Sequence, residues 1–142
     1  MRGAFAAIVA LFVLAVGGGT PLVESSAGME PTVYLQSPSH NIACVIFPGG
    51  VRCDIRHYSW PVPPKPKSCE FDYGGGLSLN KKGKGYYNCV SDTVLGMGKV
   101  LPYGHSRSLG RFRCTSKKSG MRCVNRRNGH GFLLARESIR LF

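Results

Sequence analysis

The chain has 142 residues, which is the length of one modest domain. Its 19 Gly, 9 Pro and 6 Cys favour a turn-rich β protein over a helical bundle. A hydrophobic fraction of 43% excludes a wholly disordered chain. Lys and Arg outnumber Asp and Glu by 19 to 7, and the net charge of +12 favours an anionic partner or surface without identifying one.

The N-terminus has the pattern of an export signal. A continuous apolar run at residues 3–16 follows Met1 and Arg2. It is shorter than the ~20 residues that span a bilayer. Small residues permit cleavage after Gly19, at the more usual distance, or after Ala27, where the residue chemistry is better. We therefore expect a signal peptide at 1–27, a single secreted domain at 28–142 and no transmembrane anchor.

The mature part reads as short strands separated by turns, and no segment keeps a helical period beyond two turns. Residues 61–67 are rich in proline and predict an extended connector. We expect turns at Gly74–Gly76, Gly96–Gly98 and Asn128–Gly129. Besides two hairpins described below, we expect strands at Thr32–Gln36, Gly85–Val90, Thr93–Leu95, Lys99–Pro102 and Gly131–Ala135, and an extended piece near Ile139–Phe142. The predicted class is all-β, a small disulfide-braced antiparallel domain built from hairpins.

An internal repeat predicts how the cysteines pair. Ile42–Asp54 matches Phe112–Val124, because each contains two cysteines separated by eight residues, with Gly-Val-Arg or Gly-Met-Arg directly before the second. If each repeat folds as a hairpin, its two cysteines lie opposite each other, ~4.5–5.5 Å apart, within reach of a disulfide. Export makes disulfides the default state. The predicted pairs are Cys44–Cys53, Cys114–Cys123 and, by elimination, Cys69–Cys89.

A zinc site is the alternative use of these cysteines. It would take Cys53, His57, Cys69 and one further ligand, but the chain has no Cys-x2-Cys pair. We predict no metal and no cofactor.

The hairpin register also predicts which side chains face water. In the first hairpin the residues that share a face with the cysteines are all apolar, so we expect it in the core. In the second, Phe112, Cys114, Met121 and Cys123 are predicted to point inward. A slip of one residue would exchange the two faces. The other face would carry Arg111, Arg113, Thr115, Lys117, Arg122 and Arg126, with Val124 as its single apolar member.

Several motifs between Tyr34 and Phe142 resemble a family of small secreted actinobacterial proteins, frequent in mycobacteria and classed as a domain of unknown function. The resemblance implies an exported six-cysteine domain and brings no assigned activity, cofactor or catalytic residues. The chain differs from that pattern in its cationic load over 81–84 and 107–127. The motifs are Ser37–Cys44, Gly50–Ile55, Ser59–Trp60 with the prolines up to Cys69, Asp92–Gly96, Leu101–Gly104, Gly129–Phe132, Arg136–Ser138 and Arg140–Phe142.

Charge gives the first function hypothesis. Residues 93–136 contain ten Lys or Arg and no Asp or Glu. Such a block suits an anionic polymer or surface, either specifically or by loose adhesion, and it also suits plain solubility. We expect a monomeric, non-enzymatic protein, secreted or associated with the cell wall, which binds an anionic component. The predicted contacts are Arg111, Arg113, Lys117, Arg122 and Arg126.

Two other classes of function remain open. A small cationic nuclease would need His57, His105 and His130 to converge with Glu70 or Asp54. No serine-hydrolase elbow and no phosphate-binding loop is present, so no catalytic residue is predicted. An inhibitor-like module would instead present an exposed Trp60 and the proline-rich loop that follows it, although a buried Trp60 on a segment crossing the core is the expected arrangement.

Overall fold

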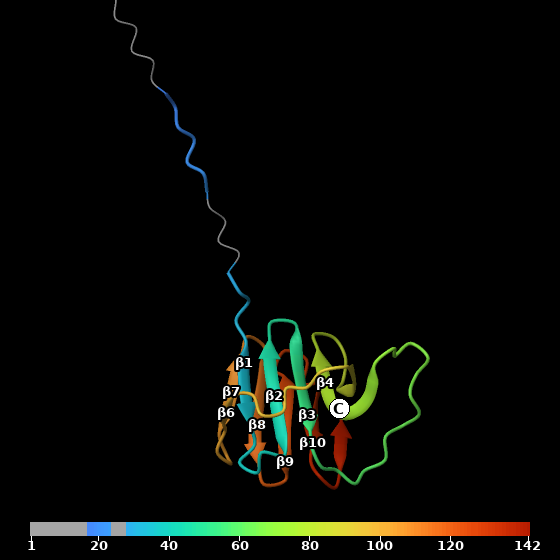
Figure 1. Cartoon of the computed structure of the whole chain (residues 1–142). Helices are drawn as coiled ribbons and strands as arrows, with labels where there is room; N and C mark the ends of the chain where they lie inside the picture. The colour runs from blue at the N-terminus through green and yellow to red at the C-terminus, as the bar shows by residue number, and fades with distance from the viewer. Residues whose placement is uncertain (1–16, 24–27) are drawn as a thin grey trace, which may run out of the picture.

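The computed structural model describes residues 17–23 and 28–142 (Figure 1). The apolar run at 3–16 and the cleavage position after Ala27 lie outside the described residues. Within them, no helix is long and apolar enough to cross a membrane. The described chain contains strands and turns only, so the predicted all-β class is confirmed.

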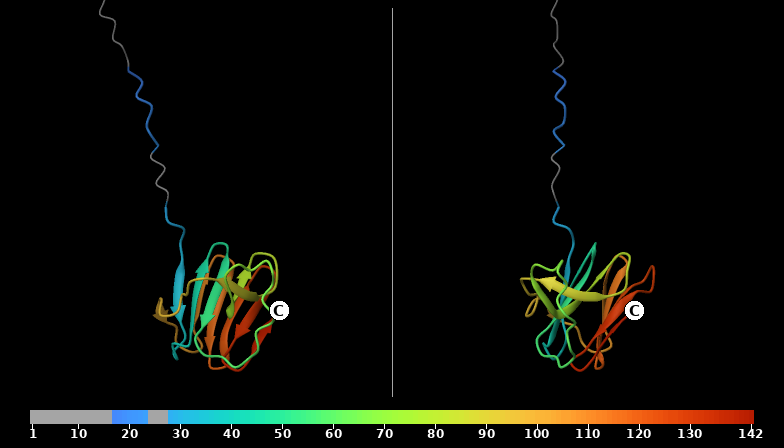
Figure 2. Two further views of the ribbon diagram at one scale, coloured as in Figure 1. Left: turned by 45° about the vertical axis from the view of Figure 1, so that its right-hand side comes forward. Right: turned by 90° about the vertical axis from the view of Figure 1, so that its right-hand side faces the viewer.

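Two sheets pack face to face as a sandwich (Figure 2). Sheet A has the strand order β5-β4-β3-β2-β1-β6, and sheet B has the order β11-β10-β9-β8-β7. All neighbours are antiparallel except β1 and β6, which are parallel. The strands of sheet A are β1 Val33–Gln36, β2 Ile42–Phe47, β3 Gly50–Ile55, β4 Asp72–Asn80, β5 Tyr86–Val90 and β6 Lys99–Val100. Those of sheet B are β7 Ser106–Leu109, β8 Phe112–Lys117, β9 Gly120–Asn125, β10 Gly131–Leu134 and β11 Ile139–Leu141.

The sequence repeat corresponds to a repeat in topology. Strands β1 to β5 follow one another across sheet A, and β7 to β11 do the same across sheet B. The repeated hairpin supplies the second and third strands of each series, namely β2–β3 and β8–β9. Each half of the sandwich is thus a five-strand meander, and β6 is an extra edge strand between them.

The core lies between the inner faces of the two repeated hairpins. Cys44 pairs opposite Cys53, and Cys114 opposite Cys123, in the predicted register. The structure contains the disulfides Cys44–Cys53, Cys69–Cys89 and Cys114–Cys123, which is the pairing that the repeat predicts. The inner side chains around the first and last of these bonds are almost fully buried: Ile46, Val51, Leu77, Phe112, Met121, Phe132 and Leu134.

A loop covers the outer face of sheet A. Residues 91–98 run from β5 at one edge to β6 at the other and cross in front of the sheet (Figure 1). Val94 in this loop packs on Ala43 and Val45 of β2, so β2 is buried on both faces and reads as a continuous apolar run. Asp54 of β3 holds the loop by accepting hydrogen bonds from Thr93 Oγ1 (3.1 Å) and from the Val94 amide (2.9 Å).

Two expectations about local structure are wrong, and the strands β4 and β7 were not predicted. The segment Thr93–Leu95 is β-rich in composition, but it belongs to the covering loop and pairs with no strand. Gly74–Gly76 is not a turn between elements, because β4 continues through it with an irregular register between Tyr73 and Leu77. Positive φ angles at Gly74 (87°) and Gly75 (69°) provide this bulge. Ser106–Leu109, which is short and polar, forms the unpredicted edge strand β7.

Trp60 is buried, as expected, and its segment, which connects β3 and β4 of sheet A, makes hydrogen bonds to the chain just after β10 of sheet B. The indole is 7% exposed and stacks on Tyr58 with a ring separation of 4.1 Å. Its Nε1 donates a hydrogen bond of 2.8 Å to the carbonyl oxygen of Ala135, just after β10. The proline-rich loop therefore does not present an exposed indole.

Candidate functional site

The outer face of sheet B carries a row of cations. Opposed residues of neighbouring strands point to the same face, and Thr115, Arg122, Leu133 and Arg140 are opposed in turn across β8, β9, β10 and β11. A second row on the same face, two residues earlier along β8, contains Ser108 and Arg113. We define the basic face as the outward-pointing residues Arg113, Lys117, Arg122 and Arg140.

Neighbouring side chains fix the positions of these guanidinium groups. Arg122 and Arg140 lie over the ring of Phe142, with Cζ 5.1 Å and 5.5 Å from the ring centroid. Arg113 Nε donates a hydrogen bond of 3.1 Å to Ser108 Oγ. Each of these contacts restricts an arginine side chain, so less side-chain entropy is lost when it binds an anion.

The register of the second hairpin is as predicted, and three of the five predicted contact cations, Arg113, Lys117 and Arg122, point outward from its strands. Arg111 and Arg126 are next to each other at the end opposite the β8–β9 turn, where the Arg126 amide donates to the Arg111 carbonyl. The Arg126 side chain is already engaged, because its Nη2 donates to the Gly110 carbonyl at 2.7 Å. Arg140 belongs with Arg122 but was not among the predicted contacts, since the sequence does not show that β11 pairs with β10.

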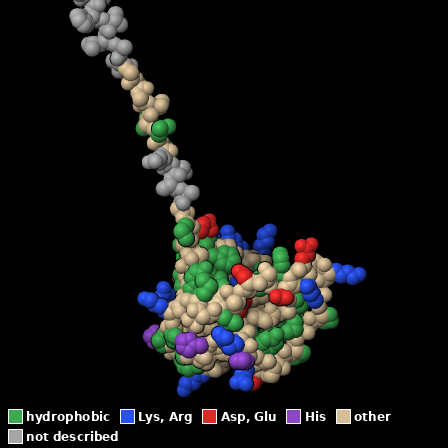
Figure 3. Space-filling model, viewed as in Figure 1, with side chains coloured by type: hydrophobic (Ala, Val, Ile, Leu, Met, Phe, Trp, Pro, Cys, Tyr) green, Lys and Arg blue, Asp and Glu red, His purple; other side chains and the backbone are tan. Residues whose placement is uncertain are grey.

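The ion pairs of the described residues lie on the side of sheet A, away from the basic face. Both ion pairs of the described residues involve Arg52 on sheet A, with Asp54 at 2.8 Å and Asp92 at 2.7 Å, so no arginine of the basic face has an acidic partner there. Figure 3 views the opposite side of the molecule, where Asp and Glu side chains appear around the covering loop. The basic face is consequently a cationic surface without internal neutralisation.

A cleft opens at one end of the sandwich, where five turns and loops meet. Its volume is about 550 Å³, within the range of small-molecule sites. They are the connections between β1 and β2, after β3, between β6 and β7, between β8 and β9, and between β10 and β11. Ile42 and Met121 of the two inner faces form its apolar wall, and Ser116 points between them. Histidine and cationic side chains gather at this end, the lower end of Figure 3.

The rim of this end cleft is cationic and rich in hydroxyls. Its charged residues are Arg56, Lys117, Lys118, Arg136 and Glu137. Lys117 also belongs to the basic face, so the cleft and the face are adjacent. Two of the four histidines, His40 and His57, line the cleft, together with Tyr103 and the hydroxyls of Ser37, Ser39, Ser119 and Ser138.

The residues considered for a nuclease are not all brought together. His57 lies at the end cleft, whereas His130 lies in the turn between β9 and β10, at the other end of β9. A six-residue strand separates the two ends, roughly 17 Å. Asp54 is 4% exposed and fully engaged by Arg52, Asn88, Thr93 and Val94. The glycine that follows His130 is explained by packing alone, because a Cβ at Gly131 would collide with the Cys123 carbonyl and press on the Phe142 ring.

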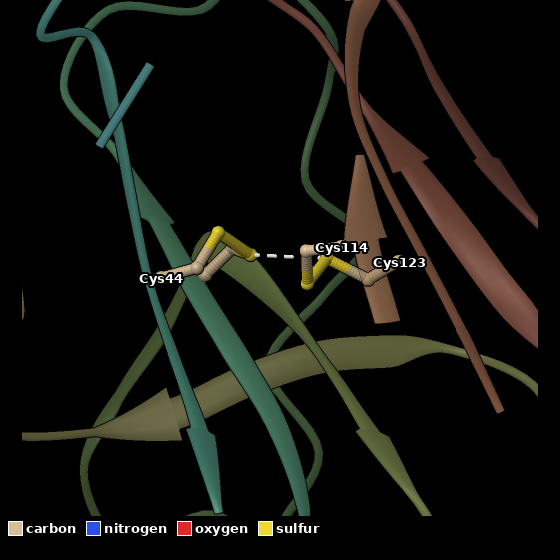
Figure 4. A group of neighbouring side chains, drawn as sticks. Cys44, Cys114 and Cys123 are labelled. Carbon is tan, nitrogen blue, oxygen red and sulfur yellow. Dashed lines mark hydrogen bonds between the residues drawn. A yellow bond between two sulfur atoms is a disulfide. The ribbon is translucent and has the colours of Figure 1, made fainter. Parts of the chain in front are cut away.

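Four cysteine sulfur atoms gather in the centre of the core, within 4.8 Å of one another (Figure 4). They belong to the disulfides Cys44–Cys53 and Cys114–Cys123, so they provide no thiolate for a metal ion. The alternative zinc set is also divided, because Cys53 and Cys69 belong to different disulfides.

Comparison with known proteins gives a family without an activity. Residues 20–142 match the family of unknown function DUF6636. The chain belongs to this family. No curated protein and no solved structure matches the chain. The match agrees with the predicted family of unknown function, and the three disulfides, which are typical of proteins outside the cytoplasm, agree with the predicted six-cysteine domain.

Proposed function

We propose that this protein is exported and binds an anionic polymer of the cell envelope or the extracellular surface through the basic face. It acts as a binding protein and not as an enzyme. The single observation that supports this most is the row formed by Arg122 and Arg140 over Phe142, with Arg113 beside it and no acidic partner among the described residues.

The geometry suits an extended ligand. Residues of one face repeat every ~6.8 Å along a strand and ~4.8 Å across a sheet, so arginines on neighbouring rows match charges that recur along a polymer. Arginine also offers paired N–H donors to a phosphate or carboxylate. Because the surface is an open sheet and not a pocket, we expect it to recognise charge spacing and not one chemical unit.

The test is co-sedimentation of oxidised protein, residues 28–142, with envelope from its own host at ~0.15 M salt, where exposed charges more than ~8 Å apart are largely screened. A polyphosphate and a polygalacturonate serve as defined probes of phosphate and carboxylate. We expect the wild type to be retained and the variant Arg113→Gln/Arg122→Gln/Arg140→Gln to lose at least tenfold in affinity. The variant should also show a shallower dependence on salt, because fewer counterions are released.

A matched variant separates position from charge. Lys81→Gln/Lys82→Gln/Lys84→Gln also removes three positive charges, but from the exposed loop between β4 and β5. This loop lies at the end of the sandwich away from the end cleft. We expect it to bind like the wild type. If the two variants lose equal affinity while all three disulfides stay intact, the cations bind only by nonspecific adhesion, and the basic face is excluded as a site.

A further inference from the structure

We propose that the end cleft is a second binding site, which takes a single anionic sugar unit: a hydroxylated ring that carries one carboxylate or phosphate. The site lies between the two sheets, whereas the proposed polymer site is the open outer face of sheet B. The proposal therefore does not depend on the function of the basic face.

An unpartnered hydroxyl at the base of the cleft carries this inference. Ser116 is 1% exposed, and its Oγ is the one buried side-chain oxygen or nitrogen of residues 17–23 and 28–142 without a hydrogen-bond partner. Its backbone is fully used, since its carbonyl accepts from Gly104 and its amide donates to the His105 carbonyl. A buried hydroxyl without a partner is costly, and apolar side chains would fill this position better in a purely structural role. Ser116 is one of the residues that line the cleft, and its Oγ is closed off from water in the free protein, so a ligand would reach it through a small movement of the side chains around it.

The rim identifies the charge of the ligand. Arg56, Lys117, Lys118 and Arg136 surround the cleft, and none of them forms an ion pair within the part of the chain that the structure describes. Against these four cations stands one carboxylate, Glu137. The excess of cations at the rim would hold a ligand group that carries one or two negative charges.

The remaining lining residues point to a sugar and not to a bare anion. Glu137 would repel an isolated phosphate, but it accepts hydrogen bonds from ring hydroxyls. Ser119 and Ser138 offer further hydroxyls on the rim. Tyr103 is 43% exposed beside the cleft and presents a flat ring to the apolar face of a pyranose. A volume of about 550 Å³ accommodates one or two such rings.

The experiment is calorimetric titration of the oxidised protein with four probes: D-glucuronate, D-glucose 6-phosphate, D-glucose and inorganic phosphate. We expect at least one of the two anionic sugars to bind tenfold or more tightly than glucose and than phosphate. The preference between glucuronate and glucose 6-phosphate tells a carboxylate ligand from a phosphate ligand. If neither sugar exceeds both simple probes, the proposal is wrong.

Ser116→Ala is the informative variant, because function and stability should change in opposite directions. We expect about tenfold weaker sugar binding from the lost hydrogen bond, and a melting temperature about 4 °C higher because a buried unsatisfied group is removed. Ser68→Ala, which removes an exposed hydroxyl that lies outside the cleft and forms no hydrogen bond with the described residues, should change neither. Unchanged sugar affinity in Ser116→Ala would overturn the assignment of the cleft.

A charge variant keeps the proposal testable by an independent route. Arg136→Gln at the rim should weaken binding of the anionic sugar about tenfold and leave the weak glucose signal unchanged. Arg113→Gln/Arg122→Gln/Arg140→Gln should bind the sugar normally even where it loses the polymer. Loss of sugar binding in that triple variant with retention in Arg136→Gln would place the sugar on the basic face and refute the cleft site.

Discussion

The Sγ atom of Cys53 lies 3.7 Å from the Sγ atom of Cys123, so the disulfides of the two repeated hairpins touch across the middle of the sandwich. Neither sulfur carries a proton, and the contact drawn as a dashed line in Figure 4 is therefore a van der Waals contact. All four cysteines of the two bonds are 0% exposed. They act as core side chains as well as covalent links, and each repeat supports the other.

This packing predicts an unequal cost of removing disulfides. By loop entropy alone, the Cys69–Cys89 bond should contribute most, about 3.3 kcal/mol against about 2.7 kcal/mol for each shorter loop. Burial reverses the order, because Cys44→Ala/Cys53→Ala also leaves a cavity beside Cys123. We expect that double variant to lose about 4 kcal/mol or more of unfolding free energy, and Cys69→Ala/Cys89→Ala about 3 kcal/mol, measured by guanidinium denaturation.

Contact between the two central bonds also predicts that their removal is not additive. The variant that lacks both Cys44–Cys53 and Cys114–Cys123 should differ from the sum of the two single losses by about 0.5–3 kcal/mol. Pairing the loss of Cys69–Cys89 with either central bond should give a sum within about 0.5 kcal/mol. Strict additivity in the first comparison would show that the sulfur contact contributes nothing.

A second prediction concerns Asp54, which connects β3 to the covering loop. Its carboxylate accepts two hydrogen bonds from Arg52, at 3.1 Å and 2.8 Å, one from Asn88 at 2.7 Å and two from the loop. Asp54→Ala leaves these buried donors without an acceptor, so we expect a loss of about 3–5 kcal/mol in unfolding free energy. Thr93→Val removes one of the five bonds and should cost about 1 kcal/mol. Similar small losses in both variants would contradict a central role for the carboxylate.

The sequence predicted the parts of the fold that depend on local pattern. The repeat and the strict alternation around Cys44, Cys53, Cys114 and Cys123 specify register, since a slip of one residue would expose the cysteines. The edge strand β7 and the interior strand β4 were not predicted from local pattern. Strand β7 is polar, and the three consecutive glycines of β4 read as a turn, because the bulge that uses them appears only when β5 is paired.

The candidate site was predicted only where it follows the second hairpin. Arg113, Lys117 and Arg122 were placed together by alternation along β8 and β9, whereas Arg140 reaches them by a pairing between distant strands. The end cleft had no signal in the sequence, since its lining comes from five connections that meet only in the folded sandwich. Ser116 in particular reads as an ordinary inward residue of a strand, and only its missing hydrogen bond distinguishes it.

A third prediction concerns the link between Trp60 and Ala135. Trp60→Phe keeps an aromatic ring against Tyr58 but leaves the Ala135 carbonyl without the donor at 2.8 Å. We expect a loss of about 1–2 kcal/mol in unfolding free energy. Trp60 is the only tryptophan, so the measurement needs circular dichroism instead of indole fluorescence. Tyr58→Leu, which removes the stacked partner and keeps the indole hydrogen bond, is the control and should cost about 0.5–1.5 kcal/mol.

The last prediction is a dependence of stability on pH that arises at Asp92. The side-chain hydrogen bond from Arg52, and then the positive charge of Arg52, hold the pKa of Asp92 below its ordinary value. Burial lowers the pKa of the Arg52 guanidinium, but its hydrogen bonds to Asp54 and Asp92 outweigh burial and raise it. Arg52 therefore stays charged throughout the acid range, and only the carboxyl titrates.

The sign of the effect follows from the lowered pKa. The folded state binds the Asp92 proton less readily than the unfolded state, so the contribution of Asp92 is present above the unfolded pKa of about 3.9. It is lost as the pH falls through the lower folded pKa. We expect Asp92→Asn to have a lower urea midpoint than the wild type at pH 6, and the difference to disappear by about pH 2. Asp72→Asn is the control, because Asp72 is exposed and forms no ion pair with any described residue. A difference between Asp92→Asn and the wild type that stays constant from pH 6 to pH 2 would show that the side-chain ion pair does not stabilise the covering loop.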